Sequence, residues 1–322
     1  MILYNDRQME GVMITSAKKR HFRSELAKVK KSPDLYLLLV LPLLFLFVFK
    51  LVPLCWLAMA FEDYTPFKGL ASSPFVGLKH FTRLLTDADA LRALRNTLVI
   101  SLYRFVVLFP LPIILALMLN ELTCIAGKRI IQTIVYLPHF LSWVVAGSMV
   151  ITLLSYNGGL INELLRGLGN SPVDFLSDKH KFRTILVVSA AWKDVGWNSI
   201  LYLAAITGID PQLYEAAEID GAGRFQKIKS VTLPGIADTV VVLMLLRIGS
   251  MMASNMDQVL MLYNPLVYET GDVIDTYVYR QGISKFEYSF STAVGLFNSV
   301  VGFLLLVIAN TTSNRISDRG IW

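Results

Sequence analysis

The sequence predicts an all-α integral membrane protein with six transmembrane helices. Of its 322 residues, 54% are hydrophobic and 17% are charged, whereas a soluble domain averages roughly 25% charged residues. The mean hydropathy is +0.55, and the apolar residues gather in runs of about the 20 residues that cross a bilayer. Runs such as LYLLLVLPLLFLFVF lack the alternation of barrel strands, so each span must satisfy its backbone polar groups as a helix. This balance excludes a disordered chain and argues against a soluble enzyme.

Six apolar runs have the length of a bilayer core. They cover residues 35–61, 97–119, 130–154, 183–207, 238–261 and 289–310. Local signals also start the first helix, because Ser32 can cap it, Pro33 suits its first turn and Asp34 complements its dipole. Prolines inside the first two spans remove backbone donors and predict kinks; they are Pro42, Pro53, Pro110 and Pro112.

Basic residues indicate which way the spans run. Eight precede the first span: Arg7, Lys18, Lys19, Arg20, Arg23, Lys28, Lys30 and Lys31. By the positive-inside rule they hold residues 1–34, the leader, in the cytoplasm, and six spans return the tail, residues 312–322, to the same side. The first outer loop is an exception to this rule, because it carries five basic residues of its own: Lys68, Lys79, Arg83, Arg92 and Arg95.

The leader contains one apolar stripe. Phe22, Leu26 and Val29 are spaced to lie on one side of a helix among Lys and Arg. An interfacial helix on the inner headgroups explains this spacing, and a solvated basic helix is the alternative. The predicted organisation is therefore the leader, a six-helix transmembrane domain over residues 35–311, and the tail.

The remaining composition indicates neither a metal site nor a nucleic-acid partner. The net charge of +6 arises mainly from the leader rather than from a basic patch with exposed aromatics. Cys55 and Cys124 fall in different compartments under the predicted topology, so we expect no disulfide. The histidines lack ligand spacing; they are His21, His80, His139 and His180.

Residues 208–235, between the fourth and fifth spans, form a cytoplasmic loop with a regular pattern. Asp210 can cap a short helix and Pro211 suits its first position. Gly221 and Gly223 then allow a sharp turn, because glycine enters the left-handed region at low cost. Small residues on one side of this helix would let another protein approach closely, which favours a docking element. The alternative interpretation is an amphipathic segment that lies on the membrane surface.

This loop resembles the EAA loop of binding-protein-dependent ABC importer permeases. Glu215-Ala216-Ala217, three residues, Gly221, nine residues and then Val231-Thr232-Leu233-Pro234 match EAA-x3-G-x9-I-x-LP, with valine as the departure. The lead-in LYLAAITGIDPQLYEAA is similar to the carbohydrate-uptake branch. YLPHFLSWVVAGSMV resembles permeases for oligosaccharides and polysaccharides, alginate-type importers most of all. The likeness covers nearly the whole chain beyond the leader.

The resemblance implies a type I ABC importer permease fold in a bacterial inner membrane, with a cytoplasmic coupling helix. The implied partners are a second, homologous permease, two ATPase subunits, an extracytoplasmic solute-binding protein and an oligo- or polysaccharide. The residues that would dock on the ATPase are Glu215, Ala216, Ala217, Asp220 and Gly221. No G-x4-G-K-[ST] phosphate loop occurs in the sequence, so ATP and Mg²⁺ would be bound by the partners. We expect no cofactor and no catalytic residue on this chain.

Polar residues inside the spans predict a substrate pathway. Ionisable groups in a bilayer are costly unless they pair or face a cavity, and indole rings with amides can hold pyranose rings. The candidates are Trp192, Lys193, Asp194, Trp197, Asn198, Arg247, Asn255, Asp257 and Asn298. Helix packing also recruits polar residues, so each of them has a structural explanation as well. Gly295, Ser299 and Gly302 have the spacing of a packing face.

Charge suggests a cargo and an alternative mechanism. Lys193 and Arg247 would suit an anionic saccharide such as a uronate chain, unless each neutralises an adjacent acid. A secondary sugar transporter driven by an ion gradient is the alternative, with Asp194 or Asp257 as its proton or sodium site. A membrane-embedded enzyme acting on polysaccharide ranks last, because no paired carboxylates or nucleophile make it concrete.

Overall fold

The computed structural model describes most of the chain as helix. The described residues are 33–253, 256–317 and 320. Chain contacts divide the chain after Ala58 into two compact units, here unit 1 (1–58) and unit 2 (59–322). Among the described residues the elements are all helical, apart from an isolated antiparallel bridge. The predicted leader stripe falls outside them.

Unit 1 supplies the first apolar helix. It comprises α2 (Pro33–Leu46), η1 (Phe47–Leu51) and most of η2 (Val52–Phe61). α2 is described from Pro33, the first described residue, so the predicted cap at Ser32 lies outside the described residues. The turn widens at η1, where the N–H of Val52 donates to the carbonyl of Phe47. The next residue, Pro53, has no N–H to donate and would crowd the carbonyl four residues back in a regular helix.

The second apolar run is a longer helix than predicted. The elements here are η3 (Leu70–Ser72), α3 (Lys79–Thr86), α4 (Ala88–Leu108) and α5 (Pro110–Asn120). The helix starts ahead of the predicted span at residue 97, because Asp87 caps α4 and accepts from the N–H groups of Asp89 and Ala90, both at 2.9 Å. Pro110 begins α5, at the predicted interruption.

The third apolar run is broken. It forms α6 (Ile125–Tyr136), η4 (Leu137–Phe140) and α7 (Trp143–Leu154). The two arms, Ile125–Phe140 and Trp143–Leu154, meet at 103°, so a single continuous helix over 130–154 is wrong. Pro138 lies at the start of η4 and Ser142 caps α7 through the N–H of Val145, which gives both sides of the break a local cause.

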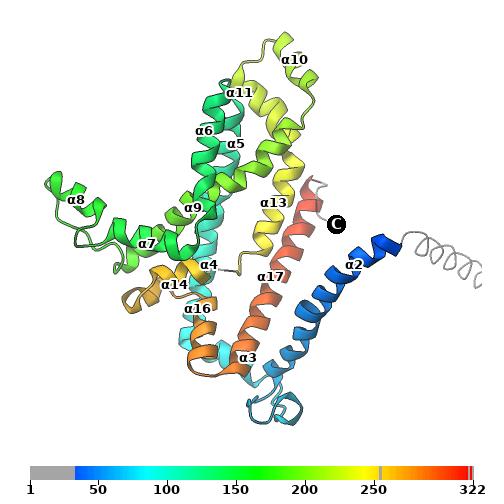
Figure 1. Cartoon of the computed structure of the whole chain (residues 1–322), viewed down its shortest axis with the longest axis vertical. Coiled ribbons are helices and arrows are strands. Elements are labelled where there is room, and N and C mark those ends of the chain that lie inside the picture. The colour runs from blue at the N-terminus through cyan, green and yellow to red at the C-terminus, as the bar shows by residue number, and fades with distance from the viewer. Residues whose placement is uncertain (1–32, 254–255, 318–319, 321–322) are drawn as a thin grey trace, which may run out of the picture. The chain divides into compact units, whose positions relative to one another are not determined.

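The fourth run is the central helix of unit 2. After α8 (Leu160–Gly167), α9 (Lys179–Thr207) extends for 29 residues and packs against α4, α5 and α6 (Figure 1). Asp178 caps it and moves its start ahead of the predicted residue 183. It is not among the described helices that are both long and apolar enough to cross a membrane. At about 1.5 Å per residue its length is nonetheless sufficient to cross a bilayer.

The loop and the fifth run follow. They contain α10 (Pro211–Ile219), α11 (Arg224–Lys227), η5 (Ile228–Thr232), α12 (Leu233–Gly235) and α13 (Ala237–Gly249). The arms Arg224–Gly235 and Ala237–Gly249 form a pair bent by 62°. The predicted helix over 238–261 is wrong in its second half, because α13 ends at Gly249 and Met252 and Ala253 follow in turns and coil.

The remaining elements are short helices and one long one. They are α14 (Met256–Leu262), η6 (Pro265–Val267), α15 (Tyr268–Gly271), α16 (Ile274–Tyr279), η7 (Arg280–Ser284) and α17 (Tyr288–Ser317). α17 runs past the predicted tail boundary at 311. It packs on α13, where Gly302 approaches the carbonyl of Gly249. Within unit 2, α10 lies at the end opposite α3 and α16 (Figure 1).

The number of membrane crossings is only partly fixed by helix length. Three described helices are long and apolar enough to span, namely Tyr36–Phe61, Ala88–Asn120 and Tyr288–Arg315, and there are five if each bent pair counts once. α9 would be the sixth. The six-span topology therefore stays a prediction, although the all-helical class is confirmed.

Candidate functional site

The loop between α9 and α13 starts as the sequence predicts. The Asp210 carboxylate accepts from the N–H of Gln212 at 2.9 Å, and Pro211 occupies the first position of α10. Because these signals are local, they act without help from the rest of the fold. α10 is a nine-residue helix on which Glu215 and Ala216 are exposed and Ala217 is half-buried.

A Schellman turn ends α10. The N–H of Gly221 donates to the Glu218 carbonyl at 3.0 Å, and the N–H of Ala222 donates to the Ala217 carbonyl at 2.9 Å. This pairing requires a left-handed residue, and Gly221 has φ of +77°. Gly221 is therefore needed for the direction in which the chain leaves the helix.

Further contacts fix the two arms of the loop relative to each other. The N–H of Gly223 donates to Gln226 Oε1 at 3.0 Å and starts α11. Tyr214 Oη lies 3.0 Å from Thr232 Oγ1, and Lys227 Nζ pairs with Glu218 Oε2 at 3.1 Å. These contacts connect α10 to α11 and η5, and the segment 211–232 is called the elbow below. A displacement of α10 would therefore be transmitted to η5 and to α13, which follows it in the chain.

The outer surface of this elbow combines a hollow with exposed apolar side chains. The hollow has a volume of about 490 Å³ and is lined by Ala217, Asp220, Ala222, Gln226, Lys229 and Ser230. Ile219 and Phe225 are 86% and 87% exposed beside it. Sequence reasoning missed these two, although large apolar residues in a polar loop are themselves a signal. The predicted docking residues Ala217 and Asp220 thus share one concave surface.

Three predicted pathway residues instead converge on the break in the third apolar run. Lys193 is buried, and its Nζ donates to the His139 carbonyl at 2.6 Å. Asp194 Oδ1 lies 3.1 Å from His139 Nδ1. The Trp197 indole stacks on the same imidazole, with ring centroids 4.6 Å apart. The cluster holds η4 against α9, which gives each of the three a structural role.

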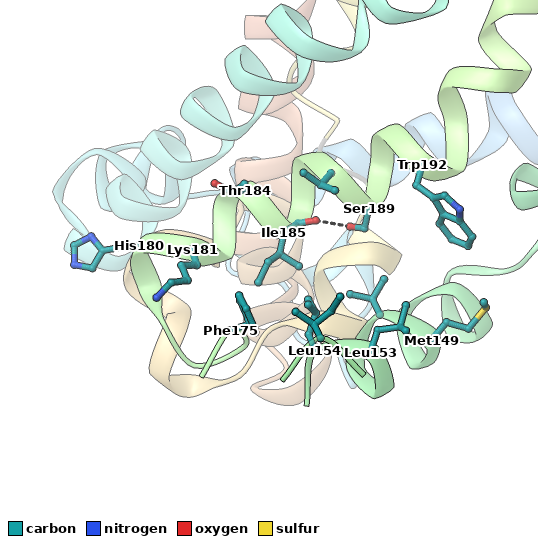
Figure 2. Close-up of a pocket in the computed structure, with 13 residues that line it drawn as sticks. Met149, Leu153, Leu154, Phe175, His180, Lys181, Thr184, Ile185, Ser189 and Trp192 are labelled. Atoms are coloured by element: carbon teal, nitrogen blue, oxygen red, sulfur yellow. Dashed lines mark hydrogen bonds between the residues drawn. The ribbon is translucent and has the colours of Figure 1, made fainter. Parts of the chain in front are cut away.

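Trp192 lines a cavity that is almost entirely apolar. Its volume is about 580 Å³ and it lies between α7 and α9. His180 and Lys181 occupy one end and Trp192 the other, while Leu153, Leu154 and Phe175 face α9 across it (Figure 2). The Ser189 hydroxyl is engaged by the Ile185 carbonyl at 2.6 Å. A polysaccharide needs many hydrogen-bond partners, so this cavity would accommodate an apolar group better than a sugar.

Asn198 and Arg247 meet at a smaller, more polar cavity. It has a volume of about 220 Å³ between α4, α5, α9 and α13, and Tyr202 and Ser250 also line it. Asp257 is exposed on α14. Asn298 donates to the Met252 carbonyl at 3.1 Å, and Asn255 falls outside the described residues. The structure therefore brings together two of the nine predicted pathway residues at a polar cavity.

Arg104 is the charged group that sequence reasoning missed. It lies in α4 with 5% of its surface exposed, and its guanidinium donates to Gln258 Oε1. The Gln258 amide in turn donates to the Leu186 carbonyl and the Ser189 hydroxyl, both at 2.8 Å. An arginine inside an apolar run is a functional candidate by default, and that signal was available in the sequence.

Comparisons with known proteins agree with this architecture. Residues 109–318 match the family described as binding-protein-dependent transport system inner membrane component. The chain is 41% identical over 317 residues to the polygalacturonan/rhamnogalacturonan transport system permease protein YteP of Bacillus subtilis (strain 168), which covers 98% of this chain and 99% of YteP.

Solved structures are similar as well. A chain of a bacterial ABC transporter involved in the import of the acidic polysaccharide alginate is 40% identical, with a TM-score of 0.84 over 90% of this chain and 98% of that one. A chain from the alginate ABC transporter in complex with an alginate pentasaccharide-bound periplasmic protein is 39% identical, also with a TM-score of 0.84, over 91% and 98%.

Proposed function

Since this chain belongs to the family of binding-protein-dependent transport system inner membrane components, we propose that it is the permease subunit of an ATP-driven importer for an oligo- or polysaccharide. Similarity to a polygalacturonan/rhamnogalacturonan permease and to an alginate transporter, each along nearly the whole relative, supports the saccharide class. The subunit lies in the bacterial inner membrane with its loop, leader and tail in the cytoplasm.

The proposed assembly has partners on both sides of the membrane. A second, homologous permease completes the pathway, and two cytosolic ATPase subunits bind ATP and Mg²⁺. An extracytoplasmic solute-binding protein delivers the saccharide, by analogy with the complex that contains an alginate-loaded periplasmic protein. This chain performs no hydrolysis in the proposal; it moves between outward-open and inward-open arrangements.

The observation that carries the proposal is the braced elbow at Gly221. Its concave surface through Ala217 and Asp220 combines small and polar residues and is flanked by the exposed apolar side chains Ile219 and Phe225, a mixture that suits a docking surface. The Lys227–Glu218 pair and the Tyr214–Thr232 contact would pass movement of an ATPase into α13 through η5. Nucleotide-dependent geometry of the partner thereby supplies the differential contacts that a population shift requires.

Co-purification and transport test this function. The chain should purify with an ATPase pair and a second membrane subunit, and reconstituted vesicles should take up saccharide only when ATP is supplied on the loop side. Uptake by this chain alone, driven by a proton or sodium gradient without nucleotide, would instead establish the secondary-transporter alternative with Asp194 or Asp257 as the ion site.

Gly221→Asp tests the elbow itself. A side chain at φ +77° strains the Schellman turn by about 1–2 kcal/mol, and the carboxylate adds charge beside the docking surface. We expect ATP-dependent uptake and copurification of the ATPase to fall at least about tenfold, the factor that corresponds to 1.4 kcal/mol, with normal membrane insertion. Gly208→Asp is the matched control, because Gly208 is exposed with φ of −85°. Equal uptake by Gly221→Asp and wild type would contradict the docking role.

A further inference from the structure

Arg104 lies midway along its helix and is held there by a side-chain hydrogen bond. It lies sixteen residues from Ala88 and sixteen from Asn120, the ends of the α4–α5 helix. Gln258 Oε1 accepts a hydrogen bond from the Arg104 guanidinium, and the Gln258 amide donates to Leu186 and Ser189 of α9. Because Arg104 is 95% buried and fixed by a buried amide, its remaining donors have a defined direction.

One of those donors is unsatisfied. Arg104 Nε is buried without a hydrogen-bond partner among the described residues. Neither Arg104 nor Arg247 makes an ion pair with any acid in the described ranges. A buried cation without a counter-charge destabilises the fold. An anionic ligand would supply the counter-charge that the Arg104 guanidinium lacks.

Arg104 and Arg247 line the same small cavity. Its volume is about 130 Å³, and its lining contains hydroxyl groups but no carboxylate: Ser101, Arg104, Phe105, Arg247, Ser250, Met251 and Ala253. The Asp194 carboxylate, on α9, is engaged by His139 at 3.1 Å. Two cationic groups thus share one polar space within the membrane.

This space adjoins the larger polar cavity. Arg247 and Ser250 line both the 130 Å³ and the 220 Å³ cavities, and Asn198 and Tyr202 add polar groups to the second. A ligand that spans both would place an anionic group between the arginines and hydroxyl groups beside the amide and phenol. The guanidinium fork matches the geometry of a carboxylate.

We propose that Arg104 and Arg247 form an anion subsite that binds a sugar carboxylate as it passes through the membrane. The inference rests on the proposed function and assigns its cargo to acidic saccharides. The cargo class agrees with the relatives, which are named for polygalacturonan and alginate, but the subsite follows from the two unpaired arginines. Of the two, Arg104 is the fixed member, and Arg247 links the subsite to the larger cavity.

The test uses the complete reconstituted complex with ATP and compares trigalacturonate with its methyl ester. Losing a charge-assisted hydrogen bond corresponds to about a tenfold or greater effect. We therefore expect Arg104→Gln and Arg247→Gln to lower the acid-to-ester uptake ratio about tenfold or more, and Arg247→Lys to retain most of it. Arg166→Gln is the matched control, because Arg166 is an exposed arginine paired with Glu163. The binding protein is the same throughout, so the change in ratio reports on the permease.

A second measurement needs no uptake of the ester. Arg247→Cys is prepared with Cys55 and Cys124 replaced by serine, and is labelled to completion with thiosulfonates that add an aminoethyl or a sulfonatoethyl group. The two adducts are similar in size and opposite in charge. We expect the cationic adduct to restore trigalacturonate uptake and the anionic adduct to abolish it.

Two groups of results overturn the subsite and leave the importer intact. Equal loss of acid and ester uptake in Arg104→Gln and Arg247→Gln would assign the arginines to packing or to a carboxylate of the second permease. Equal effects of the two adducts would exclude a role for charge. By contrast, wild-type uptake that does not depend on ATP would refute the proposed function itself, and the two failures are therefore distinguishable.

Discussion

At the scale of single residues, one glycine determines how closely α9 approaches α6. A Cβ atom added to Gly196 would lie 1.9 Å from the Val135 carbonyl oxygen and 2.5 Å from its carbon. These are backbone atoms, so no rotamer change can relieve the overlap. The crossing places Lys193, Asp194 and Trp197 within reach of His139, so the cluster depends on a residue without a side chain.

Gly196→Ala should therefore destabilise the protein. Overpacking costs about 1–3 kcal/mol where side chains can adjust, and a contact with backbone lies at the upper end of that range. We expect a lower midpoint of thermal unfolding in detergent. Gly295→Ala is the control, because a Cβ there meets nothing within 4 Å and alanine favours a helix. A Gly196→Ala protein as stable as Gly295→Ala would show that the helices do not cross as described.

At the scale of elements, the broken third span is a joint fastened to α9. The break leaves carbonyl groups at the end of η4 without helical partners, and the Lys193 ammonium donates to two of them, at 2.6 Å for His139 and 3.5 Å for Pro138. The Trp143 ring lies 5.6 Å from the same Nζ atom. The lysine thus stabilises a non-helical segment where water is scarce.

Lys193→Met separates this role from a role in the pathway. Losing a buried charged donor should reduce the free energy of unfolding by about 1.5–3 kcal/mol, measured by thermal unfolding in detergent. Lys181→Met on the same helix is the control; Lys181 is exposed and pairs with Asp178, and such pairs contribute about 1 kcal/mol or less. Should Lys193→Met unfold normally and yet lose uptake, Lys193 belongs to the substrate pathway, as the sequence predicts.

At the scale of the whole molecule, the loops opposite the elbow carry carboxylates with lowered pKa values. A hydrogen bond from Lys79 lowers the pKa of Asp63, although partial burial opposes the shift. Hydrogen bonds from Lys181 and from the His180 N–H lower the pKa of Asp178, and a hydrogen bond from Lys179 lowers the pKa of Glu269. These groups prefer the charged form in the folded protein.

Acid should therefore weaken this end of unit 2. A folded pKa below the unfolded value means that the contribution is complete above the unfolded value, 3.8 for Asp63 and 4.5 for Glu269, and is lost as pH falls through the folded value. We expect these groups to leave the midpoint temperature of thermal unfolding unchanged from pH 7 to pH 5 and to lower it below pH 4. Asp63→Asn should reduce the decline; an unchanged decline would assign it to other carboxylates.

The sequence by itself determined the features that depend on neighbouring residues. Long apolar runs must be helices in lipid, so the all-α class was predictable. Asp210, Pro211 and Gly221 act within one or two turns, so both ends of α10 were predictable as well. The family pattern at Glu215 and Gly221 was recognisable for the same reason, since its spacing lies within a single loop.

The tertiary structure decided the features that depend on residues far apart in the chain. Arg104 and Gln258 are 154 residues apart, and Lys193 and His139 are 54 apart, so no local pattern pairs them. Hydropathy alone also predicted one helix over residues 130–154, because the two arms on either side of the 103° break are both predominantly apolar. Hydropathy reports that a residue avoids water, whereas only packing decides which helix, carbonyl or cavity it meets instead.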